Sequence, residues 1–353
     1  MEECNTDPKN GVIAYSSAKR ARFVVLTIVL SASLAVFYIL CLFLGTVDLS
    51  FGDVIDIFMG NGTWGNTYIV ETLRMPRVAC AAIVGAGLSV AGMAMQAMFR
   101  NPMASPSVLG LSSGAAFGAS LAIGLGVGGA LGSFAVPFMA FLLCFATITL
   151  VYALAHTRYG VPTVLLLLAG IAVGTFFSGM SSMVQYAVDK DALADIVYWT
   201  MGSFARCTWN SVEMSLISVG AGVTIIALCS RELNLLSMGE EQARSLGVNL
   251  RRVRTALLIG TALTVGGCVA VSGVIGFVGL IIPHICRALV GPEHQRLWII
   301  CVLAGALFMM AIDLACRLIS TSTGSFPVGV LTSLIGAPFF VYIMRKKRNE
   351  LWG

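Results

Sequence analysis

The sequence predicts an all-α, polytopic membrane protein with about ten transmembrane helices. Of its 353 residues, 58% are hydrophobic and only 11% are charged, and the mean hydropathy is +0.90, far outside the range of soluble globular chains. Apolar runs long enough to cross a bilayer recur along the whole chain. Lysines and arginines gather between alternate runs, which is typical of a protein that threads back and forth through a membrane.

The expected spans follow from the length of the apolar runs, since a hydrocarbon core of about 30 Å needs roughly 20 residues per helix. The plain candidates are 23–45, 78–99, 131–155, 163–187, 210–229, 255–272, 297–316 and 327–344. Two further runs raise the number to ten. The first, 107–129, is rich in glycine, and the second, 273–291, follows the previous run with only Ser272-Gly273 as a break.

The distribution of positive charge tests this count. With ten spans and a cytoplasmic N-terminus, 17 of the 22 Lys and Arg residues fall in cytoplasmic segments, as the positive-inside rule expects. The residues left outside are Arg74, Arg77, Lys190, Arg206 and Arg317. Fusing 255–291 into one span would put the RKKR tail on the wrong side. We therefore expect a cytoplasmic N-terminal segment 1–22, a transmembrane domain 23–344 and a cytoplasmic basic tail 345–353.

An internal repeat joins two of these spans. RVACAAIVGAGLSVAG at 77–92 and RVRTALLIGTALTVGG at 252–267 agree in register, with Gly85 matching Gly260 and Ser89 matching Thr264. By the orientation above, the two copies run in opposite directions, which is the inverted repeat of many transporters. The other interpretation is two glycine-rich packing helices that agree by composition.

Ionisable groups are scarce inside the predicted spans, although ion-coupled carriers usually keep them at mid-membrane. The chain contains no G-x-x-x-x-G-K-[ST] phosphate loop, so we do not expect it to bind a nucleotide in that way. Its ten cysteines and three histidines show no metal-ligand spacing, so no metal and no cofactor are expected in this chain. The net charge of +5 comes mostly from clusters between apolar runs, and it gives no sign of a nucleic-acid surface.

One polar stretch, SMGEEQARSLGV at 237–248, stands out from the apolar chain. Ser237 and Glu240 fit the S-x-x-E capping box that opens a helix, and Gly247 stands where a left-handed residue would end it. The stretch therefore predicts a short capped helix on the cytoplasmic side. A surface loop that happens to be helical is the alternative.

Several segments resemble a known family when they are taken together and in order. They are LRMPRVACAAIVGAGLSVAGMAMQAMFRNPMASPSVLGLSSGAAFGA at 73–119, YWTMGSF at 198–204, SMGEEQARSLGVNLRRVR at 237–254, SGVIGFVGLIIPHICRALVGPEHQR at 272–296 and FPVGVLTSLIGAPFF at 326–340. The set resembles the FecCD family of ABC-importer permeases, which carry iron-siderophore complexes, haem or cobalamin. This resemblance implies a type II ABC importer permease whose permease domain is 23–344.

The resemblance also implies functional residues. The helix at 237–248 would be the coupling helix that docks on an ATPase subunit, through Ser237, Gly239, Glu240, Glu241, Ala243, Arg244, Leu246 and Gly247. Arg74, Arg77 and Arg317 on the outer side would meet acidic residues of a binding protein, although arginines that snorkel to the interface would have the same positions. The loops with Asn101, Pro102, Met103 and with Thr163 and Val164 would narrow the cytoplasmic end of the path.

The expected assembly is a homodimer in the cell membrane, the inner one in a bacterium, with both termini cytoplasmic. It would work with two ATPase subunits, which bind ATP-Mg, and with an extracytoplasmic substrate-binding protein, in contact with membrane lipid and with no nucleic acid. The chain itself would not be an enzyme. The substrate would be an iron-siderophore or a related chelate such as haem or cobalamin. An ATP-independent secondary carrier or channel for a small solute is the alternative.

Overall fold

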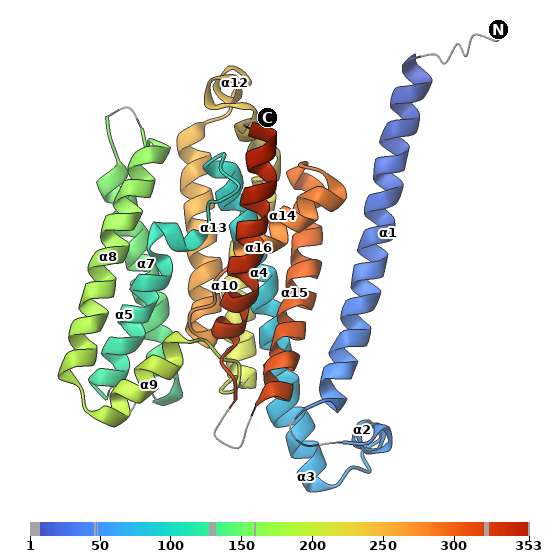
Figure 1. Ribbon diagram of the computed structural model, residues 1–353, viewed down its shortest axis with the longest axis vertical. Helices are drawn as coiled ribbons and strands as arrows, with labels where there is room; N and C mark the ends of the chain where they lie inside the picture. The colour runs from blue at the N-terminus through green and yellow to red at the C-terminus, as the bar shows by residue number, and fades with distance from the viewer. Residues whose placement is uncertain are drawn as a thin grey trace.

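The computed structural model describes residues 8–45, 47, 49–126, 132–158, 160–320 and 325–351. Within these ranges the chain is built from helices and contains no strand beyond one isolated bridge between Thr157 and Gly160. The predicted all-α class is therefore confirmed. The helices stand side by side as a bundle, and α1 lies along one flank (Figure 1).

Seven helical stretches of the described chain are long and apolar enough to cross a membrane. They are α1 (Pro8–Phe43), the continuous run from α3 (Trp64–Thr67) through a π-helical turn (Tyr68–Arg74) to α4 (Met75–Met98), α7 (Ala135–Ala155), α8 (Thr163–Ala187), α10 (Trp209–Leu228), α13 (Leu250–Ser272) and α15 (His294–Ile319). Shorter apolar helices are α5 (Leu111–Gly124), α14 (Val278–Val290) and the apolar part, Val328–Ile343, of α16 (Val328–Leu351). Together they match the ten predicted spans.

The two spans that were hardest to predict are shorter than expected. In the 107–129 span, a 3-10 turn (Pro106–Leu109) precedes α5, and Gly110 separates them with a positive φ of 75°. In the 273–291 span, α14 begins only at Val278, after Phe277 with a φ of 67°. The helix before it, α13, ends at Gly273, which has a φ of 70° and approaches Trp199 so closely that a Cβ there would lie 2.1 Å from the Trp199 carbonyl oxygen.

The irregular backbone is satisfied by other irregular segments. Ser203 N–H donates to the Ser272 carbonyl at 2.7 Å, and Val328 N–H donates to the Gly202 carbonyl at 2.9 Å. The irregular segment before α10 therefore bonds to the end of α13 and to the start of α16, and such bonds are how non-helical backbone is tolerated among membrane helices. The amphipathic helices α2 (Phe51–Phe58), which follows α1, and α9 (Lys190–Thr200), which follows α8, both lie at the end of the bundle opposite α12 (Figure 1).

The core lies around α4, the most buried of the candidate spans, and α13 comes next. Two glycines of α4 make its close contacts: a Cβ on Gly85 would lie 2.1 Å from the Gly305 carbonyl oxygen, and one on Gly92 would lie 1.9 Å from that of Gly279. Small residues allow helices to approach in lipid, where hydrophobicity alone does not drive them together. The helices α4 and α13 carry the predicted repeat, and they run in opposite directions (Figure 1).

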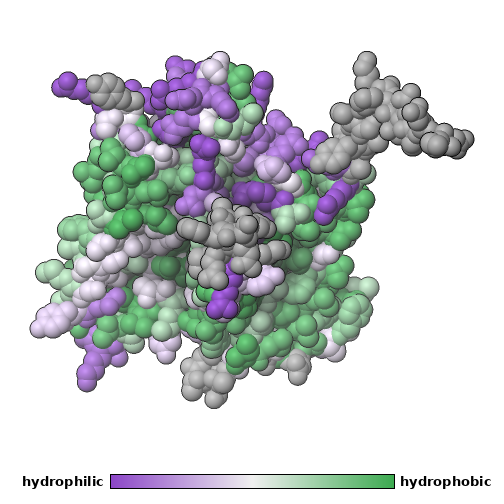
Figure 2. All heavy atoms as spheres, turned by 45° about the horizontal axis from the view of Figure 1, so that its top comes forward, coloured by the Kyte–Doolittle hydropathy of each residue, from purple (hydrophilic) through white to green (hydrophobic). Residues whose placement is uncertain are grey.

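Polar residues gather at one end of the bundle. Figure 2 shows hydrophilic side chains over the end where α12 (Glu240–Ser245) lies, with hydrophobic surface along the body. At this end α1 begins and α16 finishes (Figure 1). The helix α1 already begins at Pro8, inside the predicted N-terminal segment 1–22, and α16 runs to Leu351, through most of the predicted tail 345–353.

Candidate functional site

The polar stretch forms a helix break and a short helix, but the predicted capping box is wrong. Ser237 lies in the last turn of α11 (Ser230–Met238), where its hydroxyl donates to the Leu233 carbonyl at 2.9 Å. The N-cap of α12 is Gly239, with a φ of 133° and no side-chain cap. The serine is already inside a helix and bonds to the carbonyl four residues back, so it is not free to cap the next one.

The predicted end of α12 is confirmed in detail. Gly247 has a φ of 84°, its N–H donates to the Arg244 carbonyl at 2.9 Å, and the Val248 N–H donates to the Ala243 carbonyl at 3.0 Å. This pair of bonds is the Schellman motif. Ala243 is fully buried, whereas Leu246 is 61% exposed, and Glu241 and Arg244 are exposed as well. The short helix thus packs on the bundle with one face and exposes the other face at the surface.

Arg254 fixes α12 to the rest of the protein. Its side chain is buried on α13 and forms an ion pair with Glu240 in the first turn of α12. The same guanidinium donates from Nη1 to the Val161 carbonyl at 2.8 Å. Val161 stands two residues before α8. One buried cation therefore joins α12 to the chain that leads into α8.

The sequence reasoning missed Arg254 because it counted this residue only as one of the inner positive charges. A signal was present. The buried apolar face of α13 includes Leu250, Val253, Leu257 and Leu258. Arg254 lies on this same face, at helical spacing from these residues. A charge on the apolar face of a helix is almost always paired.

The first predicted gate loop is a defined turn that follows α4. Arg100 leaves the helix with a φ of 49°, and the Asn101 side chain accepts a hydrogen bond from the Met103 N–H at 2.9 Å. The asparagine thereby forms an Asx turn. The Arg100 side chain lies near the helix break between α11 and α12, since a Cβ on Gly239 would lie 4.0 Å from its Nη1. Asn101 and Pro102 are exposed, and Met103 is half-buried.

The second predicted gate segment opens α8. Pro162 is the N-cap of this helix, Thr163 is half-buried, and Val164 is 65% exposed. The chain after the first loop returns onto the same helix, where a Cβ on Gly170 would lie 2.6 Å from the Val108 carbonyl oxygen. The structure thus brings both predicted gate segments to the end of the bundle that holds α12, and Arg254 links the second of them, through Val161, to that helix.

The predicted docking arginines lie at the opposite end and have partners inside the protein. Arg77 pairs with Asp313 at 2.8 Å, and Arg317 pairs with the same carboxylate at 3.1 Å. Arg317 also donates to the Cys41 carbonyl at 2.9 Å, and Arg74 donates to the Leu42 carbonyl at 2.6 Å. These two arginines therefore satisfy the carbonyls at the end of α1.

The burial of these arginines limits the contacts that they can make with another protein. Arg74 is 6% exposed and Arg317 is 5% exposed, and the Arg77 side chain is 14% exposed. An arginine that meets a partner's carboxylate must offer free N–H groups. Docking by these residues stays a prediction, and Arg77 is the most accessible of the three for it. Neither a metal-binding group of three or more His, Cys, Asp or Glu side chains nor a strand-borne site occurs in the described ranges.

In the described part of the chain, ten apolar helices, two of them the antiparallel repeat helices α4 and α13, and a short helix held at one polar end define a multi-pass membrane protein. The comparisons with known proteins identify its kind. The model of the FecCD transport family matches residues 33–346, so the chain belongs to this family of ABC-importer permeases of the type II fold.

Two relatives and one solved structure illustrate the similarity. The chain is 40% identical over 279 residues to the cobalamin import permease of Halobacterium salinarum, covering 79% of this chain and 74% of the relative. It is 35% identical over 285 residues to the molybdate import permease of Haemophilus influenzae, covering 80% and 83%. An inward-facing ABC transporter of the metal-chelate type superposes with a TM-score of 0.81 at 33% identity, covering 91% and 98%.

Proposed function

We propose that this chain is the membrane-spanning subunit of an importer for a metal-bearing chelate, of the ferric-siderophore, haem or cobalamin kind. A solved relative of the metal-chelate type supports the chelate, and a cobalamin permease is similar as well. A molybdate permease is nearly as similar, so molybdate is the second candidate substrate. The orientation in this proposal puts α12 and both ends of the chain in the cytoplasm.

The observation that carries the proposal is the attachment of α12. A helix that receives a push from an ATPase subunit must be accessible on one face and firmly connected on the other. In this chain Glu241, Arg244 and Leu246 are exposed, while Ala243 is buried and Glu240 pairs with Arg254. The proposed assembly is two copies of this chain with two ATPase subunits, which bind ATP-Mg and hydrolyse ATP, and a substrate-binding protein outside.

The proposed gate consists of Asn101, Pro102 and Met103 in one loop and Thr163 and Val164 in the other. Each connects to the coupling segment, the first through Arg100 beside Gly239 and the second through Val161 and Arg254. A motion of α12 would therefore act on both loops. At the far end, the proposed contact with the binding protein includes Arg77, with Arg74 and Arg317 supporting it from within.

The test is uptake by proteoliposomes that contain this chain, its partner ATPase and the binding protein. A panel of a ferric hydroxamate siderophore, haem, cobalamin and molybdate is offered with and without ATP on the ATPase side. We expect ATP-dependent accumulation of one of the three chelates. Accumulation of molybdate alone would show that the substrate is molybdate and no metal chelate. Equal uptake with and without ATP would show that the chain works as a secondary carrier or channel and not as an ABC importer.

A further inference from the structure

The short helix α2 has an exposed apolar face at the end of the bundle opposite α12. Phe51 and Phe58 are 67% and 65% exposed, and Ile55 and Met59 are exposed as well. These four residues follow the spacing i, i+4, i+7 and i+8, which places them on one face of the helix. Large apolar side chains gathered on an exposed face are typical of a surface that binds a membrane or another protein.

The other two faces of α2 already have their surroundings. Val54 and Ile57 are buried and pack on Val70 of the π-helical turn. Asp53 and Asp56 stand away from the exposed apolar face, since an α-helix turns by about 100° per residue. Asp53 also closes a capping box with the residue before the helix. The helix is therefore formed and fixed without any contribution from its exposed apolar face.

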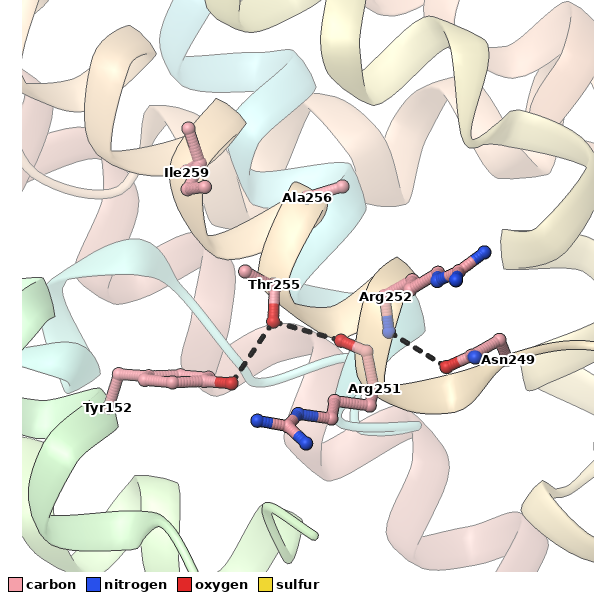
Figure 3. Close-up of a pocket in the computed structure, with 7 residues that line it drawn as sticks. All are labelled: Tyr152, Asn249, Arg251, Arg252, Thr255, Ala256 and Ile259. Carbon is pink, nitrogen blue, oxygen red and sulfur yellow. Dashed lines mark hydrogen bonds between the residues drawn. The ribbon is translucent and has the colours of Figure 1, made fainter.

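A hollow at the opposite end of the bundle, between α7 and α13, differs from this face (Figure 3). The Thr255 hydroxyl lies 3.2 Å from the Tyr152 hydroxyl across the hollow, while Arg252 points to the other side of α13. The polar groups there thus bond to one another or turn away. The apolar face of α2, in contrast, is left uncovered by the described part of the chain.

The length of α1 gives the depth of α2 in the membrane. From Phe23 to Phe43, α1 contains no charged residue and rises by roughly 30 Å, which is the thickness of a hydrocarbon core. The rings of Phe43 and Phe51 stack with their centroids 5.2 Å apart. The first turn of α2 therefore lies at the boundary where α1 leaves the hydrocarbon core.

The apolar face of α2 continues the lipid-facing surface of α1. Of the candidate spans in the described chain, α1 is the least buried. Leu40, Leu44 and Val47 are exposed at its end and in the connection that follows, and they lead to the exposed Phe51. Figure 1 shows α2 at the foot of α1, beyond the flank of the bundle. Lipid surrounds a spanning helix at such a place, so the surface next to α2 is that of the bilayer.

We propose that α2 is an interfacial helix that inserts its apolar face into the leaflet opposite α12. Amphipathic helices lie in the plane of a membrane with the apolar face about 5–10 Å deep, at the boundary of headgroups and acyl chains. Asp53 and Asp56 then face water. In the next helix, Trp64 stacks on Tyr68 at 5.7 Å, and both residue types are enriched at membrane interfaces. The proposal depends neither on the substrate nor on the ATPase.

Photocross-linking of the full chain in phosphatidylcholine vesicles tests the proposal. The photoreactive residue p-benzoylphenylalanine replaces Phe58 in one variant and Asp56, on the other side of the same helix, in the matched control. After irradiation, mass spectrometry identifies the adducts. We expect a phosphatidylcholine adduct at position 58 and little or none at position 56. Equal lipid adducts at both positions, no lipid adduct at position 58, or an adduct to a second copy of the chain in its place would overturn the proposal.

A double variant measures how much the membrane contact stabilises α2. Phe51→Ser with Phe58→Ser leaves the buried face of α2 intact, so the chain should still fold. In vesicles, we expect amide hydrogen exchange within α2 to become about tenfold faster or more, because two phenylalanines no longer leave water for lipid. Asp56→Asn is the control and should leave exchange as it is in the wild type. Unchanged exchange in the double variant would mean that the protein alone holds α2, and the proposal would be wrong.

Discussion

The buried Arg254 of α13 forms an ion pair with the partly exposed Glu240 of α12, and the same guanidinium donates to the Val161 carbonyl at 2.8 Å. Three segments that are far apart in the sequence therefore meet at one side chain. Because the guanidinium is planar and its donors have a fixed geometry, it holds both partners in one arrangement. We therefore expect a displacement of α12 to be passed to the chain that leads into α8.

Arg254→Gln should uncouple ATP hydrolysis from transport. The amide is shorter and uncharged, so Glu240 and the Val161 carbonyl both lose their partner. With the assembled importer in proteoliposomes, we expect uptake per ATP hydrolysed to fall by about 5–150-fold, the usual range of coupling between sites, while hydrolysis continues. Arg231→Gln, which removes an exposed arginine from the same end, is the control. A parallel fall of uptake and hydrolysis would point to lost assembly instead.

Asp313→Asn should destabilise the fold strongly. Asp313 is fully buried and is the carboxylate shared by Arg77 and Arg317. Removing its charge leaves two guanidinium groups facing each other, and breaking a buried pair costs about 3–5 kcal/mol. Thermal denaturation of the purified chain should show a large fall in midpoint. The matched control is Asp195→Asn, because Asp195 pairs with Arg206 at the exposed surface and such a pair is worth about 0–1 kcal/mol. Similar shifts in both variants would contradict the prediction.

Gly92→Ala should destabilise the contact between α4 and α14. A Cβ on Gly92 would lie 1.9 Å from the Gly279 carbonyl oxygen, so the two backbones would have to separate. Overpacking of this kind costs about 1–3 kcal/mol, measured as a lower midpoint of thermal denaturation. Gly220→Ala is the control, because that helical glycine has no atom within 4 Å of a built Cβ and alanine favours the helix. If Gly92→Ala proved as harmless as the control, the close packing would be wrong.

The sequence predicted the class, the ten spans and the opposite direction of the repeat helices, because hydropathy and charge follow from the composition of each run. It failed where the outcome depends on contacts between distant segments. The end of α13 at Gly273 lies against Trp199, and the buried Arg317 donates to the Cys41 carbonyl at the end of α1. No local pattern contains either partner. Ser237 was misread for a different reason, since S-x-x-E also fits a serine in the last turn of the helix before.

Ser237 fits a capping pattern in the sequence but caps no helix in the structure, whereas Asn249 caps α13. Ser237 bonds within α11, whereas Asn249 caps α13 by accepting from the Arg252 N–H at 3.1 Å. Loss of an N-cap costs about 1 kcal/mol, so Asn249→Ala should speed hydrogen exchange at the first amides of α13 about fivefold. Ser237→Ala should leave the amides of 239–241 unchanged. Faster exchange of these amides in Ser237→Ala would contradict the prediction and support the capping box at Ser237. The helix α12 would then be started by its own sequence instead of being held in place by Arg254.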